Sequence, residues 1–271
     1  MDEEKDLTPQ DSEEEFVEEK NKNGKLVLIF IVCFVAVFCA VYFGIQAYLS
    51  HIAGPETTTV TTTQAPSAQT VIENPVDFAS LIEGNDEIYA YIVIDDTNVN
   101  YPIVQSGVDD EFYLHRAAED KSYLPQGAIF TESCNHKNFS DPVTLIYGHN
   151  NYGDTMFTTL HYFEDSDFFD SHPYFYIYTP ERRLTYQVIS AFKYDDRHIM
   201  NYNKNFTDLT LVDDFQAEVL NPGSAVKNVR EELDVPIDRH SKIVVLSTCV
   251  TNQKNNRYLV CGVLTKDEKT D

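Results

Sequence analysis

The sequence is poor in basic residues and in cysteine, and it contains no tryptophan. Lys and Arg number 20 against 44 Asp and Glu, so the formal net charge is −24 with His neutral. This charge argues against a nucleic-acid-binding protein, because neutralising phosphate groups requires a basic face. The five Cys are too few for a disulfide-stapled scaffold, and none forms a CxxC pair that would suggest zinc.

Hydrophobic side chains, in contrast, are abundant. They make up 42% of the 271 residues, which is too many for a disordered chain. Tyr and Phe number 17 each, so the aromatic content consists of residues that favour strands. The composition therefore favours a folded, strand-rich protein, and the length allows one or two domains.

Residues 26–49 contain no charged side chain and only one strongly polar one, Gln46. As a helix rising about 1.5 Å per residue, this run would span roughly 35 Å, enough to cross a bilayer with some tilt. It is longer than the core of a usual signal peptide, and it does not end in a small-residue cleavage site. It also lacks the polar stripe of a surface helix in a globular domain. We therefore predict one retained transmembrane helix.

Basic residues flank this segment on one side only. Lys20, Lys22 and Lys25 precede it, whereas no Lys or Arg follows it before Arg116. The positive-inside rule therefore predicts a cell-membrane protein with a cytoplasmic N-terminus and an extracellular remainder. Residues 1–25 hold ten acidic and four basic side chains and almost nothing that could form a core, which predicts a disordered acidic tail.

Two further segments are predicted after the anchor. Residues 50–73 are a linker, because the stretch 54–70 is dominated by Thr, includes Pro and has no aromatic residue. Residues 74–271 have the length of one domain, which the linker would hold off the membrane. At the start of this domain, residues 74–82 place Pro and Asp before an apolar run, and this pattern predicts a short helix.

Short apolar runs alternate with turn signals through the domain and predict eight strands. They cover Ile88–Ile94, Val99–Gln105, Ala128–Thr131, Val143–Tyr147, Tyr174–Thr179, Leu184–Tyr194, Lys242–Thr248 and Tyr258–Thr265. Many short strands with few helices favour a closed or nearly closed β-barrel, that is, a mainly β fold with α insertions. Apolar residues at helical spacing in Asp208–Leu220 and in Ser224–Leu233 predict a helical insertion before the seventh of these strands.

Cys249 and His149 occupy equivalent places in the chain. Each follows an apolar run and opens a polar loop, so each is expected at a strand end on the rim of the sheet. The thiolate of a Cys is a nucleophile that a nearby cation activates. Arg257 directly precedes the final strand, so a hairpin would return it beside the thiol, where its guanidinium could donate to an oxyanion. Taken singly, each residue would more often have a plain structural role: a Cys that ends a strand, a His in a turn, and a solvated Arg in a hairpin.

The other cysteines are weaker candidates. Cys33 and Cys39 lie in the predicted transmembrane helix, Cys134 lies in a polar loop, and Cys261 lies inside the last predicted strand. No HxxxH or CxxC spacing accompanies the candidate His and Cys, so no metal site is expected. Cys249 is therefore the predicted reactive thiol.

Over residues 75–266 the chain resembles the class B sortases. The motifs that carry the resemblance are Leu246-Ser247-Thr248-Cys249, Arg257 at the head of the next strand, Leu145-Ile146-Tyr147-Gly148-His149-Asn150, Met156-Phe157, and His172-Pro173-Tyr174-Phe175-Tyr176-Ile177-Tyr178-Thr179-Pro180. The chain order His, Cys, Arg is that of sortases, whereas papain-like peptidases place Cys before His. The resemblance implies a closed, eight-stranded sortase-type β-barrel with an N-terminal helix and a helical insertion before the Cys-bearing strand.

The resemblance also implies a membrane-anchored cysteine transpeptidase on the outer face of a Gram-positive-type cell. Cys249 would cleave the C-terminal sorting signal of a secreted protein after Thr and form a thioacyl-enzyme. His149 would be the general acid and base, and Arg257 would stabilise the oxyanion or the substrate. Ser247 and Thr248 would contact the sorting signal, and an amine of a peptidoglycan precursor would accept the acyl group. No cofactor or metal is implied.

The sequence leaves two alternatives open. A pilin-polymerising sortase would use a Lys of another protein subunit as the acceptor, and no short motif separates that activity from wall anchoring. A catalytically idle surface adhesin built on the same barrel is an alternative of a different class. The sorting pentapeptide is also undetermined, although class B members are associated with signals like NPxTN.

Overall fold

A computed structural model describes residues 71–151 and 153–271 of the protein. The predicted tail, 1–25, the predicted transmembrane helix, 26–49, and almost all of the predicted linker lie outside the described residues. Within the part of the chain that is described, no helix is long and apolar enough to cross a membrane. The predicted segment boundaries therefore stay predictions.

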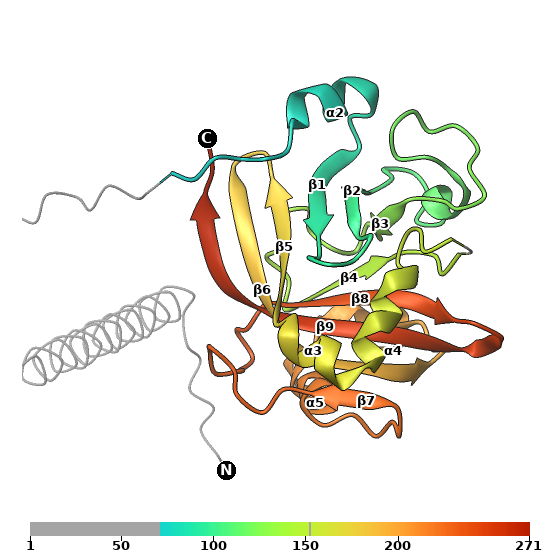
Figure 1. Cartoon of the computed structure of the whole chain (residues 1–271). Coiled ribbons are helices and arrows are strands. Elements are labelled where there is room, and N and C mark those ends of the chain that lie inside the picture. The colour runs from blue at the N-terminus through green and yellow to red at the C-terminus, as the bar shows by residue number, and fades with distance from the viewer. Residues whose placement is uncertain (1–70, 152) are drawn as a thin grey trace, which may run out of the picture. The chain divides into compact units, whose positions relative to one another are not determined.

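Nine strands in the described residues form one sheet, and eight of them close into a barrel (Figure 1). The order is β5-β1-β2-β3-β4-β8-β9-β6-β7, and β5 also pairs with β6, so β7 alone lies outside the ring. The strands are β1 (Ile88–Val93), β2 (Asn100–Val104), β3 (Ile129–Thr131), β4 (Val143–Tyr147), β5 (Tyr174–Thr179), β6 (Arg182–Asp195), β7 (Lys227–Val229), β8 (Ile243–Val250) and β9 (Gln253–Lys269). The eight predicted strands and their closure are confirmed.

The helices in the described residues are few and mostly short. The predicted N-terminal helix is present as α2 (Phe78–Gly84), and the carboxylate of Asp77 caps it by accepting from the Ser80 N–H. The others are η1 (Phe112–His115), η2 (Thr158–Glu164), α3 (Ser166–Ser171), α4 (Ile199–Tyr202), η3 (Lys204–Phe206) and α5 (Leu209–Leu220). Among these only α5 was predicted, because one or two turns are too short to show a helical period in the sequence.

Three clusters of buried hydrophobic residues organise the described domain. The strand β1 buries alternate side chains, Ala90 and Ile92 in the first cluster and Ile88 in a smaller one, while the residues between them are half-buried. The long strand β6 is buried on both of its faces, because α5 covers the outer one. The α5 side chains in this second cluster are Val212, Phe215 and Val219.

The predicted helix over Ser224–Leu233 is wrong. After α5, the segment Asn221-Pro222-Gly223 ends the helical stretch, and the chain then forms β7, which pairs antiparallel with β6. Outside the ladder of that pair, the Lys193 N–H donates to the Val226 carbonyl and the Arg230 N–H donates to the Ile189 carbonyl. The backbone N–H and C=O groups of this segment therefore form hydrogen bonds with the free edge of β6, whereas in a helix they would have bonded to one another.

The register of three strands brings the two predicted strand ends together. The strands β4 and β8 run parallel with Tyr147 opposite Ser247, so the residues two positions further on, His149 and Cys249, emerge at the same end of the barrel. The strands β8 and β9 form an antiparallel hairpin in which Cys249 lies opposite Arg257. The predicted hairpin that returns Arg257 to the thiol is therefore present.

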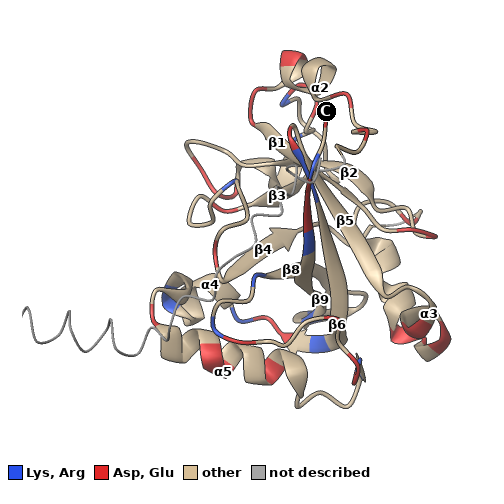
Figure 2. Ribbon diagram, turned by 90° about the vertical axis from the view of Figure 1, so that its left-hand side faces the viewer, with Lys and Arg blue, Asp and Glu red and all other residues tan. Residues whose placement is uncertain are grey.

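Acidic side chains are spread widely over the surface of the barrel. Figure 2 shows them along α3, along α5 and in several loops rather than in a single patch. Basic side chains are fewer, and several of them lie on the barrel strands, where Arg182 and Arg183 of β6 pair with Asp267 and Glu268 of β9. Such a surface offers no extended basic face for a polyanion.

Candidate active site

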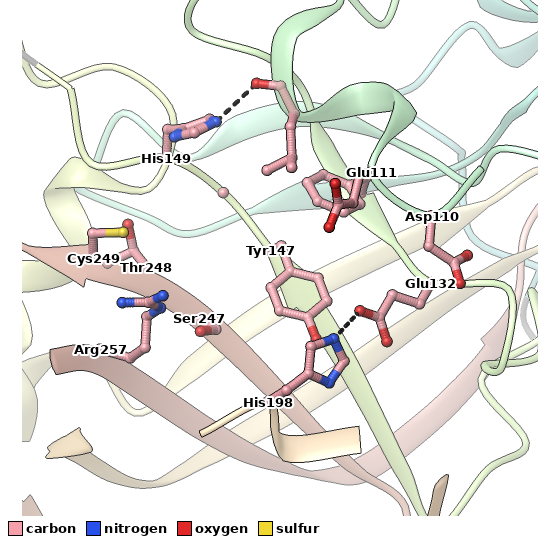
Figure 3. Close-up of a pocket in the computed structure, with 13 residues that line it drawn as sticks. Asp110, Glu111, Glu132, Tyr147, His149, His198, Ser247, Thr248, Cys249 and Arg257 are labelled. Atoms are coloured by element: carbon pink, nitrogen blue, oxygen red, sulfur yellow. Dashed lines mark hydrogen bonds and ion pairs between the residues drawn. The ribbon is translucent and has the colours of Figure 1, made fainter. Parts of the chain in front are cut away.

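A cavity of about 260 Å³ lies where β4 and β8 end and β9 begins (Figure 3). All five residues predicted for the site line it: Cys249, His149, Arg257, Ser247 and Thr248. The other lining residues are Asp110, Glu111, Leu114, Phe130, Glu132, Tyr147, Gly148 and His198. The structure thus gathers in one place residues that are far apart in the chain.

Cys249 combines an exposed side chain with a defined strand position. Its thiol is free and exposed, and the residue lies near the end of β8, directly opposite Arg257 on β9. Residues directly opposite in an antiparallel pair project from the same face, with Cβ atoms about 4.5–5.5 Å apart. A guanidinium is therefore the nearest cross-strand neighbour of the thiol.

His149 is oriented by a main-chain carbonyl. Its Nε2 lies 2.8 Å from the Leu114 carbonyl oxygen, which can only accept, so Nε2 carries the proton (Figure 3). The neutral ring then keeps Nδ1 as its free, basic nitrogen. Its ring also stacks on that of His115, with centroids 5.8 Å apart. The Leu114 carbonyl thus fixes the orientation and the tautomer of the His149 ring, as the third residue of a catalytic triad does for its His.

Gly148 is required by close packing at the end of β4. A Cβ at this position would lie 2.5 Å from Ile129 Cδ1 and 2.5 Å from Phe157 Cγ, which is closer than real Cβ contacts come. The Gly148 N–H donates to the Ser247 carbonyl at 3.1 Å and so continues the β4–β8 ladder up to His149. Close packing, and not an unusual backbone angle, requires glycine here, because Gly148 is not among the residues with positive φ.

Arg257 is partly held by its own hairpin. Its Nη1 donates to the carbonyls of Lys254, at 3.3 Å, and Asn256, at 3.2 Å. The side chain is half-buried and lines the cavity below Cys249 in the view of Figure 3. A guanidinium has five N–H donors in a rigid fork, so this anchoring leaves donors for a ligand in the cavity.

Ser247 and Thr248 contribute little accessible surface. They are 5% and 2% exposed, respectively, although both line the cavity. Side chains alternate along a strand, so Ser247 shares the face of Cys249 whereas Thr248 points to the other face. Any contact that these two side chains make with a ligand is therefore small.

Carboxylates form one wall of the cavity. Glu132 is 13% exposed at its side chain and pairs with His198, whose Nε2 lies 2.6 Å from Glu132 Oε1 (Figure 3). Burial, together with the nearby Glu132 carboxylate, raises the pKa of Tyr147 and keeps its hydroxyl protonated. Neither Glu132 nor His198 was predicted, because each sits in a loop that carries no motif.

The other described cysteines lie in unreactive surroundings. Burial and the neighbouring Glu132 raise the pKa of the Cys134 thiol to about 12. Cys261 is fully buried in the cluster beneath α5, which raises the pKa of its thiol and confirms the predicted packing role. Among residues 71–151 and 153–271, no group of three His, Cys, Asp or Glu could hold a metal ion.

Comparisons with known proteins agree with this geometry. The sequence profile of the sortase domain matches residues 92–265. The chain is 30% identical over 184 residues to sortase B of Listeria monocytogenes, covering 66% of this chain and 70% of the relative.

Solved structures of class B sortases also match this chain. The crystal structure of a Streptococcus pyogenes class B sortase involved in pilus biogenesis matches with a TM-score of 0.61 and 28% identity, over 70% of this chain and 98% of that one. The sortase B–substrate complex of Staphylococcus aureus matches with a TM-score of 0.60 and 25% identity, over 70% and 84% of the two chains. The chain therefore belongs to the sortase family and is a cysteine transpeptidase of class B.

Proposed function

We propose that this sortase cleaves the C-terminal sorting signal of a secreted protein after Thr and joins the protein to an amine of a peptidoglycan precursor. The observation that carries the proposal is the cavity in which an exposed thiol faces a cross-strand guanidinium and shares its walls with an oriented imidazole. These are a nucleophile, an oxyanion donor and a proton carrier, the three groups that acyl transfer needs.

In the first half of the reaction, Nδ1 of His149 takes the proton of the Cys249 thiol, and the resulting thiolate attacks the carbonyl carbon of the Thr residue. The negative charge that develops on the carbonyl oxygen receives N–H donors from Arg257. His149 then donates a proton to the leaving amine, the peptide bond breaks, and a thioester joins Cys249 to the Thr acyl group.

In the second half, the acceptor amine attacks the thioester carbon. The basic nitrogen of His149 takes the proton that the amine loses, and the Cys249 thiolate leaves as the new amide forms. The proton on His149 then returns to the Cys249 thiolate, so the enzyme ends in its starting state. Ser247 and Thr248 would contact the sorting signal only through their small exposed surface.

A second candidate acceptor is a Lys side chain of another protein subunit. It is favoured by one observation, the 28% identity to the Streptococcus pyogenes class B sortase that is involved in pilus biogenesis. Both acceptors present a primary amine to the thioester, so the same residues would serve either reaction.

The proposed function predicts which peptides and amines the enzyme uses. The full-length chain, purified in detergent, is incubated with a panel of fluorogenic sorting pentapeptides. We expect cleavage after Thr in at least one member, and a new amide in the mass spectrum when an amine is added. A peptide amine of the peptidoglycan type and a Lys-bearing peptide are compared as acceptors at equal concentration. Cleavage of no peptide would refute the proposal, and preference for the Lys peptide would favour pilin polymerisation.

We also propose that the chain is anchored by residues 26–49, with its N-terminus in the cytoplasm and its barrel outside. The lysines on one flank of that segment support this topology. Protease added to intact cells should remove the barrel and spare an epitope tag at residue 1. Loss of the tag while the barrel survives would show that the N-terminus lies outside the cell and the barrel inside, the opposite of the proposed topology.

A further inference from the structure

The main-chain carbonyl of Cys249 is held by two side chains. Asn150 Nδ2 donates to it at 2.8 Å, and His161 Nε2 lies 3.0 Å from it. The two nitrogens are 3.2 Å apart, so in the tautomer that leaves Nε2 unprotonated His161 accepts from Asn150, and with Nε2 protonated both nitrogens donate to the carbonyl. Asn150 Nδ2 also donates to Thr251 Oγ1 at 3.0 Å. The peptide unit that follows the thiol is therefore fixed by contacts from outside its own hairpin.

His161 is itself held on both sides. It belongs to η2, and its Nδ1 lies 2.6 Å from Glu164 Oε1. Its ring stacks on that of Tyr258, with centroids 4.9 Å apart and planes 26° apart. Both ring nitrogens thus face oxygen acceptors, and both donate when the ring is an imidazolium.

The position of this carbonyl matters because the strand ladder is irregular there. The register of β8 and β9 shifts between Cys249 and Val250, so the regular pairing stops at the proposed nucleophile. The direction of a Cys Sγ follows from the main chain that carries it. Donors on the Cys249 carbonyl therefore limit where the sulfur can point.

We propose that His161 is a positioning residue for the transpeptidation reaction. It does not line the cavity, so it acts on the thiol through the Cys249 main chain and not on the substrate. The inference rests on the proposed role of Cys249 as the nucleophile. This role of His161 could not be predicted from the sequence, because a contact with a main-chain oxygen leaves no motif.

Two substitutions separate hydrogen bonding from packing. His161→Phe keeps a ring to stack on Tyr258 but removes both donors. His161→Gln loses the ring and restores an N–H donor at similar reach. If His161 only packs against Tyr258, the Phe variant should retain more of the wild-type kcat than the Gln variant. If His161 positions the Cys249 carbonyl, the Gln variant should retain more.

The variants are compared in the full-length chain, purified in detergent, on the sorting peptide that the wild type cleaves fastest. We expect His161→Phe to lower kcat by about 10- to 100-fold, as misplacement of a reacting group by about 1 Å does. The KM and the thermal midpoint should stay near the wild-type values, and His161→Gln should recover most of the lost kcat. An unchanged kcat in His161→Phe, a loss that appears in KM or follows the midpoint, or a Gln variant no better than Phe would overturn the inference.

His172 provides a matched control. Its Nε2 lies 2.9 Å from Asp96 Oδ2, and its ring stacks on Phe168 with centroids 3.9 Å apart, but it does not line the cavity. His172→Phe should retain the wild-type kcat. Cys249→Ala, measured alongside, separates the two hypotheses. If it retains activity, the proposed function itself fails, whereas an inactive Cys249→Ala with a fully active His161→Phe overturns the positioning role alone.

Discussion

Replacing Cys249 by Ala is expected to abolish cleavage of every sorting peptide, with a loss in kcat on the order of 10⁶-fold, as when the nucleophile of a serine protease is removed. The reason is that no other described thiol can substitute. Cys134 is half-buried beside the Glu132 carboxylate, and Cys261 is fully buried. Cys134→Ala, the matched control, should retain the wild-type turnover.

Thiol labelling checks the same prediction without a substrate. A charged, membrane-impermeant methanethiosulfonate reagent should modify one thiol in the wild type that it does not modify in Cys249→Ala. Activity should fall in step with that modification. Raised thiol pKa values keep Cys134 and Cys261 protonated near neutral pH, so neither should compete for the reagent. Wild-type turnover by Cys249→Ala would show that the assigned mechanism is wrong.

Arg257→Lys is expected to lower kcat/KM by about 10²- to 10³-fold, the loss seen when one oxyanion donor is removed. Lys preserves the positive charge opposite Cys249 but has no planar fork of donors. In the wild type, Nη1 is tied to the Lys254 and Asn256 carbonyls, and this anchoring aims the other N–H groups. A single ammonium cannot keep that anchor and also donate in a fixed direction. Arg257→Ala should lose no less.

Steady-state kinetics on one sorting peptide test this prediction. Arg182→Lys is the matched control, because Arg182 pairs with Asp267 on the barrel surface and does not line the cavity. It should retain the wild-type kcat/KM. Turnover near the wild-type value in Arg257→Lys would mean that this residue acts only as a point charge and donates no directed hydrogen bonds.

Much of the barrel follows from local patterns in the sequence. The alternation in β1 and β5 reflects one face packed on the interior, which is the period that a strand imposes on its side chains. Ser224–Leu233 shows where such reasoning fails. Its apolar residues have helical spacing, yet its backbone pairs with the free edge of β6. An unpaired strand edge exists only once the sheet has assembled, so it cannot be read from the local sequence.

Some residues of the candidate site could likewise be predicted from the sequence, and others could not. Cys249 and His149 could be predicted because each follows an apolar strand segment and opens a polar one. Arg257 could be predicted because it directly precedes the apolar part of β9. The carbonyls of Leu114 and Cys249 could not be predicted, because every residue has one and only the fold decides which of them receives a donor. Glu132 and His198 pair only because two loops meet at the cavity.

The pairing of β4 with β8 has a consequence for the order in which the enzyme becomes competent. Cys249 and Arg257 belong to one hairpin, a local element that forms in about 1–10 μs in model systems. His149 reaches them only through a parallel pairing of segments that lie far apart in the chain, and such contacts form late because the loop between them must close first. Within the proposed mechanism, a folding chain would thus bring its nucleophile and its oxyanion donor together before its proton carrier. Catalytic competence would then report that β4 has paired with β8 and the barrel has closed.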